Sequence, residues 1–355
     1  MMTTLFSFVV VLGVLIFFHE LGHFLVARLF DVGVEKFSLG FGPRLFGKKI
    51  GITDYRVSAI PLVGYVKMVG EEPDAEIDPA DIPISFTHKH VFKRILIVAA
   101  GPFFNLLLAV IIFFGIFQIS GVFLLKSSIG EVREGTPAHQ AGLEKGDVIL
   151  AIDGVDVESW ADMAEIITAS KGNTLAISVQ RGESVFARDI APQITTTKNI
   201  FGEDINRYVI GITSSREVFS KDLNPLEALA ESLIQTYKIT ELTILSIVKI
   251  IQGTVPTDTI GGPIMIAEMA GQQAREGVSN FIFFIALLSI NLGILNFLPI
   301  PILDGGHLVF FFIEAAIGHP VSTKMRETAQ HVGLFVLLML MIFVFYNDIT
   351  RVFFS

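Results

Sequence analysis

The sequence predicts an α-helical polytopic membrane protein with four transmembrane helices and one soluble α/β domain outside the membrane. Its 355 residues are 52% hydrophobic and only 17% charged, and the mean hydropathy is +0.63. The chain is therefore more apolar than most soluble proteins. Four apolar stretches have the roughly 20 residues that a membrane-spanning helix needs. These expected spans lie at about residues 4–27, 95–119, 279–299 and 331–352.

The distribution of positive charge indicates how the spans are oriented. Ten Lys and Arg residues lie between the first two spans, whereas the seven residues after the second span contain only Lys126. Because cytoplasmic loops carry an excess of Lys and Arg, residues 28–94 are expected in the cytoplasm. Both termini and residues 120–278 are then expected on the outer side of the membrane.

The first span contains a metal-binding motif. HELGH at residues 19–23 is a complete H-E-x-x-H, and its i, i+4 spacing stacks two imidazoles on one helix face, where they can chelate one zinc ion. Zinc lowers the pKa of its bound water to roughly 7, and Glu20 can take that proton and pass it to a leaving amide nitrogen. The motif therefore predicts metal-assisted peptide hydrolysis. An ionisable residue at mid-bilayer costs at least about 2.5 kcal/mol, which favours a functional site over a chance match.

A catalytic zinc site usually has three protein ligands, so one more ligand is expected from another part of the chain. Asp304 is the best candidate, because the third span runs toward the cytoplasm and brings it to the depth of His19 and His23. The alternative role of Asp304 is N-cap of a helix that begins near Gly305. His307, one turn later, is a rival ligand, although a buried or capping histidine is the simpler interpretation.

Five segments carry a resemblance to a known family. They are FFHELGHFLVAR, GFGPRLFG, AIPLVGYVKM, AAGPFFNLL and NLGILNFLPIPILDGGH. Through them the chain resembles, over nearly its whole length, the site-2 protease family of intramembrane zinc metalloproteases, and specifically the bacterial regulator-of-sigma-E protease type. The resemblance implies one zinc ion per chain, held by His19, His23 and Asp304, with Glu20 as the catalytic base.

Two asparagines are candidate substrate-binding residues. The resemblance implies that Asn296, in the pattern N-x-x-P-x-P-x-L-D-G, helps to hold the substrate strand. Pro299 and Pro301 forbid a regular helix after it, and irregular backbone at membrane depth must be buried in protein or wet, as in a cleft that admits a peptide. Asn105, about ten residues into the second span, is expected to contribute a hydrogen bond to the site. An interhelical polar contact is the more ordinary role for it.

Residues 36–70 are expected to form a cytoplasmic, membrane-associated β-hairpin loop. The segment ITDYRVSAIPLVGYVKM (52–68) is β-rich and alternating, and it follows a turn-like GKKIG. A substrate helix must unwind before cleavage, and strand addition along this segment would replace its lost main-chain bonds. The alternative is an ordinary surface hairpin. Residues 71–83 hold six acids and three prolines and are expected to be a solvated loop.

The region outside the membrane resembles a bacterial PDZ domain over residues 127–215. GTPAHQAGLEKGDVILAIDG and the helical SWADMAEIITA carry this resemblance. The domain is expected to bind or exclude the outer segments of substrates, and the alternative is a spacer. Residues 216–278 are expected to form an interfacial amphipathic helix and a connector, because charges interrupt the apolar pattern of 226–253. Residues 1–126 and 279–355 make the two halves of the membrane domain.

These features predict an intramembrane zinc metalloendopeptidase of the bacterial inner membrane, with its active site toward the cytoplasm. The resemblance implies cleavage of the transmembrane segments of single-span membrane proteins in regulated intramembrane proteolysis, for example of an anti-sigma factor. The lipid bilayer is an expected partner and nucleic acid is not. The main alternative is a membrane transporter or ion-pathway protein with a His/Glu/Asp cluster, and a membrane-anchored PDZ adaptor is a third.

Overall fold

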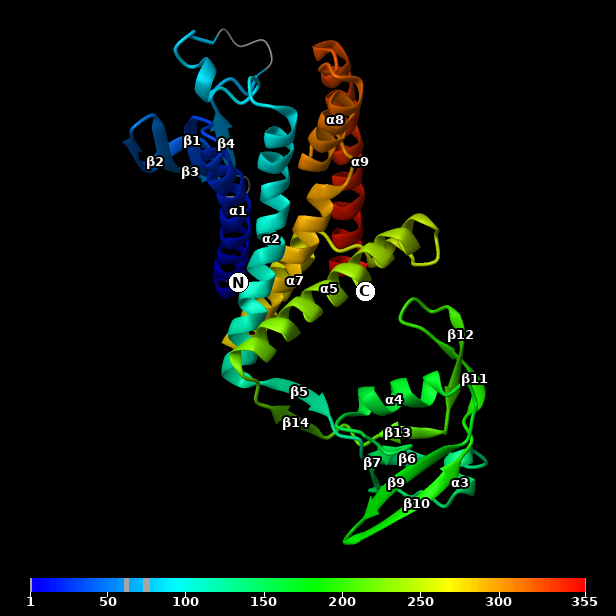
Figure 1. Cartoon of the computed structure of the whole chain (residues 1–355). Coiled ribbons are helices and arrows are strands. Elements are labelled where there is room, and N and C mark those ends of the chain that lie inside the picture. The colour runs from blue at the N-terminus through cyan, green and yellow to red at the C-terminus, as the bar shows by residue number, and fades with distance from the viewer. Residues whose placement is uncertain (1, 61–63, 73–76, 355) are drawn as a thin grey trace. The chain divides into compact units, whose positions relative to one another are not determined.

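A computed structural model describes residues 2–60, 64–72 and 77–354 of the chain (Figure 1). These residues form two compact units. The first unit comprises Met1–Ile116, Leu229–Val248 and Pro256–Ser355, and the second comprises Phe117–Ala228 and Lys249–Val255.

In the described part of the chain, four helices are long and apolar enough to cross a membrane, which confirms the four expected spans. They are α1 (Met2–Leu29), α2 (Val91–Ser120), α7 (Val278–Phe297) and α9 (Thr323–Phe354). The last of these begins eight residues before the expected boundary, because the polar segment ahead of the apolar run is helical as well.

The described residues between α1 and α2 form a four-stranded sheet. Its strands are β1 (Val34–Leu39), β2 (Phe41–Ile50), β3 (Thr53–Ile60) and β4 (Tyr65–Met68), in the order β2-β3-β1-β4. Gly51, with a φ of +61°, makes the tight turn between β2 and β3. These two strands pair antiparallel, whereas β1 pairs parallel with β3 and antiparallel with β4.

The expected hairpin is therefore corrected in its pairing. A hairpin is present, but it joins β2 to β3, and β3 does not pair with β4 as a hairpin within residues 52–68 would require. The reason is β1, which inserts between them. Sequence patterns do not predict it, because VEKFSL is short and its apolar residues do not alternate strictly. Its neighbour β4 consequently lies at one edge of the sheet, and residues 61–63 of the expected hairpin lie outside the described residues.

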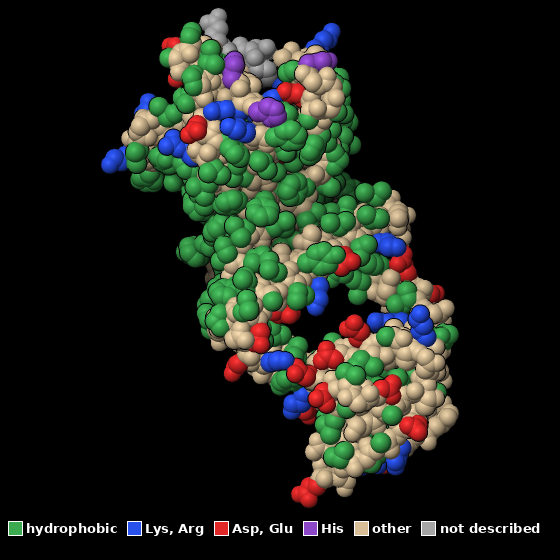
Figure 2. Space-filling model, in the orientation of Figure 1, with side chains coloured by type: hydrophobic (Ala, Val, Ile, Leu, Met, Phe, Trp, Pro, Cys, Tyr) green, Lys and Arg blue, Asp and Glu red, His purple; other side chains and the backbone are tan. Residues whose placement is uncertain are grey.

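The surface of the first unit suits a lipid environment. Phe335, Leu338 and Ile342 of α9 are 65%, 52% and 65% exposed. In Figure 2, hydrophobic side chains cover the middle of this unit, whereas many of its Lys, Arg and His side chains gather at the end that carries β1–β4. An apolar belt with a basic rim is the pattern expected of a protein that crosses a bilayer.

Three further helices pack beside the spans. They are α5 (Pro225–Ile251), α6 (Pro263–Glu276) and α8 (Asp304–Ile317). The amphipathic helix α5 is held to α7 by a hydrogen bond from Thr243 Oγ1 to Asn291 Oδ1 of 2.9 Å. Sequence patterns did not predict α6, because PIMIAEMAGQQARE combines seven apolar residues with a proline, a glycine and five polar or charged residues. It forms by packing on α1, where Gly271 lies against Thr4.

A buried carboxylate joins α6 to α9. Asp348 is 1% exposed, and it accepts hydrogen bonds from the backbone amides of Gly262, Ile264 and Met265 at 2.9, 2.9 and 3.2 Å. The first amides of a helix have no partner within the helix, so the carboxylate of Asp348 accepts the hydrogen bonds that an N-cap side chain would accept. The N-terminus of α6 is thereby fixed to the far end of the last span.

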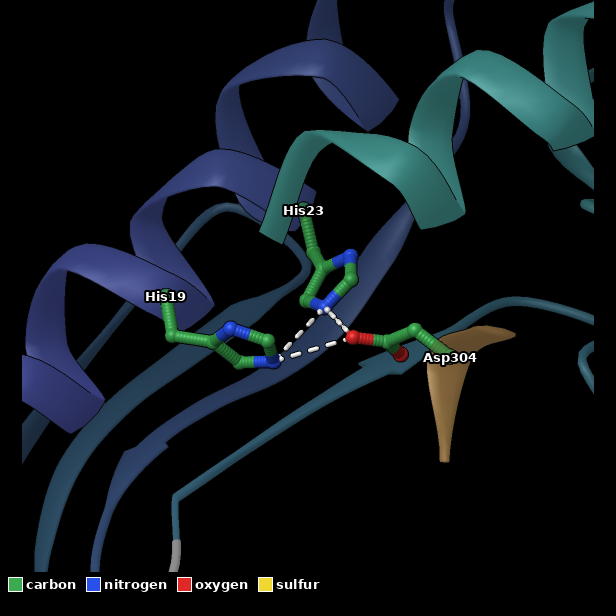
Figure 3. Close-up of side chains that lie close together, drawn as sticks. All are labelled: His19, His23 and Asp304. Carbon is green, nitrogen blue, oxygen red and sulfur yellow. Dashed lines mark hydrogen bonds and ion pairs between the residues drawn. The ribbon is translucent and has the colours of Figure 1, made fainter. Parts of the chain in front are cut away.

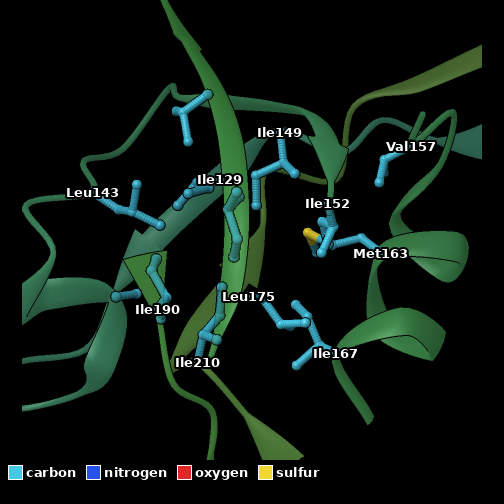
Figure 4. Close-up of a cluster of buried hydrophobic side chains, with 13 residues drawn as sticks. Ile129, Leu143, Ile149, Ile152, Val157, Met163, Ile167, Leu175, Ile190 and Ile210 are labelled. Carbon is cyan, nitrogen blue, oxygen red and sulfur yellow. The ribbon is translucent and has the colours of Figure 1, made fainter. Parts of the chain in front are cut away.

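The second unit is an α/β fold around one core. Its larger sheet has the order β10-β9-β7-β8, and buried side chains such as Ile149, Ile152 and Met163 fill the space between this sheet and α4 (Figure 4). The elements along the chain are β5 (Val122–Leu125), β6 (Ile129–Val132), α3 (Pro137–Gln140), β7 (Val148–Ile152), β8 (Val155–Asp156), α4 (Trp160–Ala169), β9 (Leu175–Arg181), β10 (Ser184–Ile190), β11 (Gln193–Lys198), β12 (Asp204–Val209), β13 (Ile212–Ser214) and β14 (Val218–Lys221).

We expect Asp348→Ala to lower the free energy of unfolding by about 1.5–3 kcal/mol, the usual contribution of hydrogen bonds to a charged group. Thermal unfolding in detergent would measure the loss, and amide exchange should rise at residues 262–265. Thr350→Ala is the matched control, since its hydroxyl bonds only to the Asn347 carbonyl of its own helix. Equal stability of the two variants would show that the contact of Asp348 does not hold α6.

Candidate metal centre

His19, His23 and Asp304 come together although His23 and Asp304 are 281 positions apart in the sequence. Figure 3 shows both imidazoles pointing from α1 toward the carboxylate of Asp304. Asp304 Oδ2 lies 3.1 Å from His19 Nε2 and 3.5 Å from His23 Nε2, and the two Nε2 atoms are 3.3 Å apart. Among the described residues, this is the one group of His, Cys, Asp and Glu that could hold a metal ion.

The spacing of these three atoms fits a tetrahedral zinc site. Ligand atoms roughly 2.0–2.1 Å from zinc at the tetrahedral angle lie roughly 3.3–3.4 Å from one another, close to the observed separations of 3.1, 3.3 and 3.5 Å. Asp304 Oδ2 is also buried without a regular hydrogen-bond partner among the described residues. A buried carboxylate oxygen in that position is well suited to a cation.

Hydrogen bonding by α2 orients the ring of His23. Its Nδ1 lies 2.9 Å from the backbone oxygen of Ile97. A carbonyl oxygen can only accept, so Nδ1 carries the proton and the lone pair of Nε2 faces the centre. Fixing the second ring nitrogen in this way is how proteins orient metal-ligating histidines.

Small residues let α1 and α2 approach closely at the site. A Cβ atom on Gly22 would lie 2.3 Å from the backbone oxygen of Ala100, and one on Gly101 would lie 2.2 Å from His23 Nε2. Neither position tolerates a side chain without movement of its neighbours. Such small-residue contacts are how membrane helices bring their backbones together, and here they create the space that the two imidazoles occupy.

Asp304 is placed by a break between α7 and α8. Residues 298–303 are not helical, as Pro299 and Pro301 require, and α8 begins at Asp304 with Leu303 as its N-cap. Asp304 therefore does not serve as the N-cap. Gly306 packs against this break, because a Cβ there would lie 2.3 Å from the backbone oxygen of Ile300.

An ion pair holds the same helix, α8, to α2. Arg94 of α2 pairs with Glu314 of α8, and the guanidinium also lies over the ring of Phe311 at 5.0 Å. Both charged side chains are largely buried, at 8% and 13% exposure. Breaking one partner of such a pair is costly, because the other charge is left buried. The helix that carries Asp304 is thus attached to the helix that orients His23.

Glu20 lines a cavity of about 230 Å³ together with the three clustered residues. Gly64 and the first two residues of β4, Tyr65 and Val66, form part of its wall. A Cβ on Gly64 would lie 2.7 Å from Glu20 Cγ, so glycine at this position leaves room for the glutamate. The cavity is large enough to hold several water molecules beside a carboxylate.

The two candidate substrate-binding asparagines and the rival ligand His307 lie outside the group of three clustered residues. Asn105 has no exposed surface and lies behind His19, with Nδ2 3.3 Å from His19 Nδ1. Asn296 is half-buried in the last turn of α7. His307 lines the cavity but is not in the metal-binding group, and burial lowers the pKa of its imidazole.

Comparison with known proteins identifies the family. The sequence profile of peptidase family M50 matches residues 7–340. The chain belongs to peptidase family M50. This M50 peptidase is accordingly a zinc metalloprotease of the site-2 protease family and a multi-pass membrane protein.

Relatives of this M50 peptidase match over almost their whole length. They carry the provisional name of zinc metalloprotease in Mesorhizobium japonicum, with 36% identity over 98% of both chains, and in Rickettsia conorii, with 35% identity over 99% of this chain and 100% of the relative. Among solved structures, a PDZ domain of an SdrC-like protein from Listeria monocytogenes has 26% identity over 24% of this chain and 84% of that chain, with a TM-score of 0.20.

Gly101 is a site residue that sequence patterns did not single out, and its role can be tested. We expect Gly101→Ala to reduce zinc retention, because the new methyl group would displace the ring of His23 from the Ile97 carbonyl. Metal content after purification and dialysis would measure this. Gly115→Ala, in the same helix with open space around it, is the control and should keep its zinc. Full zinc content in Gly101→Ala would contradict the assigned packing.

Proposed function

We propose that this M50 peptidase is an intramembrane endopeptidase that cleaves the transmembrane segments of single-span membrane proteins, with one zinc ion held by His19, His23 and Asp304. The observation that carries the proposal is the set of three ligand atoms 3.1–3.5 Å apart. Two of these residues belong to a helix with the length and hydropathy of a membrane span. Family membership supports the zinc chemistry, and the location of the ligands supports cleavage within the membrane.

Glu20 is proposed as the catalytic base. When bound, zinc acidifies a coordinated water and polarises the scissile carbonyl. The Glu20 carboxylate neighbours both histidines in the cavity, where it can accept the proton of the attacking water. It then delivers that proton to the amide nitrogen as the carbon–nitrogen bond breaks. The products are a new carboxylate and a new amine, and Glu20 returns to its ionised state.

The edge of β4 is proposed to hold the substrate in an extended form. It is the edge strand beside the cavity, and Tyr65, Val66 and Met68 line that cavity. An unwound substrate could pair with this edge and recover main-chain hydrogen bonds. Glu71 now accepts a bond of 3.0 Å from the Met68 amide, so part of the edge is covered. Asn296 has no side-chain hydrogen-bond partner among the described residues, which leaves its amide available to substrate.

The proposed setting is the bacterial inner membrane, with both termini outside and the metal centre toward the cytoplasm. The excess of Lys and Arg between the first two spans supports this orientation. Cleavage there would release a cytoplasmic fragment, such as the regulatory part of an anti-sigma factor. A transporter is the weaker alternative, because a pathway for ions does not require a tetrahedral ligand set beside a general base.

The second unit is proposed to contact the outer segments of substrates. A groove of about 200 Å³ lies between α4 and the segment from β12 to β13. Trp160, Met163 and Ile167 form one wall, and Tyr208 and Gly211 belong to the other. A groove between a helix and a strand can take an extended peptide, with apolar pockets for its side chains. A PDZ-like role in binding or excluding substrates rests on this groove.

The proposed role of Glu20 predicts that Glu20→Gln keeps the metal and loses cleavage. Glutamine preserves the size of the side chain but cannot accept the proton, so we expect at least a 100-fold loss of turnover with unchanged zinc content. The assay is cleavage of a model single-span substrate by purified protein, with a chelator-treated sample as reference. Substantial turnover by Glu20→Gln would exclude Glu20 as the base.

Asp304→Asn is expected to weaken zinc binding, because a neutral amide oxygen is a poorer ligand than a carboxylate. Zinc content and chelator competition would measure the effect, and His307→Gln serves as the comparison within the same helix. Loss of zinc in the Asp304 variant with retention in the His307 variant is the expected result. The opposite pattern would make His307 the third ligand.

A further inference from the structure

Asn105 lies beside His19 Nδ1, the ring nitrogen that points away from Asp304. The amide is buried in α2, with Nδ2 3.3 Å from His19 Nδ1. Its other end, Oδ1, is buried without a hydrogen-bond partner among the described residues. A buried amide oxygen without a partner is costly. The side chain therefore has an unused acceptor, which a half-turn of the amide group would bring to the imidazole of His19.

The chemistry of His19 determines which end of the amide it needs. An imidazole that binds a metal through Nε2 carries its proton on Nδ1, and Nδ1 then needs an acceptor. The Nδ2 group of Asn105 can only donate. A half-turn about the Cβ–Cγ bond exchanges the two ends of the amide and brings Oδ1 to His19. The metal-bound site thus gives Asn105 Oδ1 the partner that it otherwise lacks.

We propose that Asn105 is a positioning residue that accepts a hydrogen bond from His19 Nδ1 and so holds the ring in its zinc-binding tautomer and orientation. This inference rests on the proposed zinc site. Each histidine would then donate a hydrogen bond from Nδ1 to an oxygen atom of α2, because His23 already has the Ile97 carbonyl as its acceptor. Both acceptors belong to α2, so one helix orients both imidazoles of another.

Two other roles for Asn105 fit the structure less well. A substrate contact requires access to the cavity, but Asn105 has no exposed surface and is not part of the cavity wall. A purely interhelical contact is already made by its backbone, because Ser289 Oγ of α7 donates to the Asn105 carbonyl at 2.7 Å. That bond survives substitution of the side chain, so the amide itself is left for His19.

Substitutions that separate shape from hydrogen bonding test the proposal. Asn105→Leu has a similar volume but no acceptor, whereas Asn105→Asp keeps an acceptor oxygen at the same position. Asn291→Leu is the matched control, since it removes a hydrogen-bonded asparagine from α7, where the partner is Thr243. Full-length protein in detergent would be loaded with zinc and titrated with a competing chelator.

The expected result is a 10–100-fold loss of zinc affinity in Asn105→Leu, the usual effect of removing an outer partner of a metal ligand. Asn105→Asp should restore affinity to within a few-fold of the wild type, and Asn291→Leu should not change it. The visible absorption of the cobalt-loaded protein gives an independent readout of ligand geometry. It should be altered in the Leu variant and close to that of the wild type in the Asp variant.

Different outcomes overturn different claims. Unchanged zinc affinity in Asn105→Leu, with the wild type binding zinc tightly, would overturn the positioning role and leave the zinc site intact. Equal losses in the Leu and Asp variants would also overturn it, since the acceptor would then be irrelevant. If the wild type itself bound no zinc, the proposed function would fail first. An increase in KM with unchanged zinc affinity in Asn105→Leu would instead assign Asn105 to the substrate.

Discussion

The metal centre depends on how closely α1 and α2 approach each other. Glycine at positions 22 and 101 removes the side chains that would keep the backbones apart. Only at this distance can the Ile97 carbonyl reach the ring of His23. Lipid offers no hydrophobic driving force for such contact, so packing and interhelical hydrogen bonds must supply it. Two glycines therefore allow the close approach of α1 and α2 that orients His23 in the candidate metal centre.

Much of the site is predictable because its chemistry is encoded in local spacing. The i, i+4 spacing places His19 and His23 on the same face of any helix. The distribution of Lys and Arg predicts the orientation of the spans, and with it that Asp304 lies at the same depth. The four spans follow from length and hydropathy alone. These features need no knowledge of how the helices rotate against one another, which explains why sequence patterns are sufficient to predict them.

The remaining features depend on tertiary contacts that no local pattern records. The strand β1 exists because β3 and β4 both pair with it, and α6 exists because α1 and Asp348 provide partners for it. That Asn105 lies beside the ring of His19 depends on how α1 and α2 pack against each other. Polar residues at such positions are visible in the sequence, but their partners are not.

The attachment of α8 to α2 through Arg94 and Glu314 has a consequence for control of the enzyme. Asp304, the proposed carboxylate ligand, moves with α2, whereas both imidazoles belong to α1. A slip of one residue between these two helices is a rise of about 1.5 Å, several times the roughly 0.2 Å by which metal–ligand distances vary, and it would separate atoms that now lie 3.1–3.5 Å apart. A slide about as long as one carbon–carbon bond would therefore take Asp304 away from the two imidazoles while every helix stays folded.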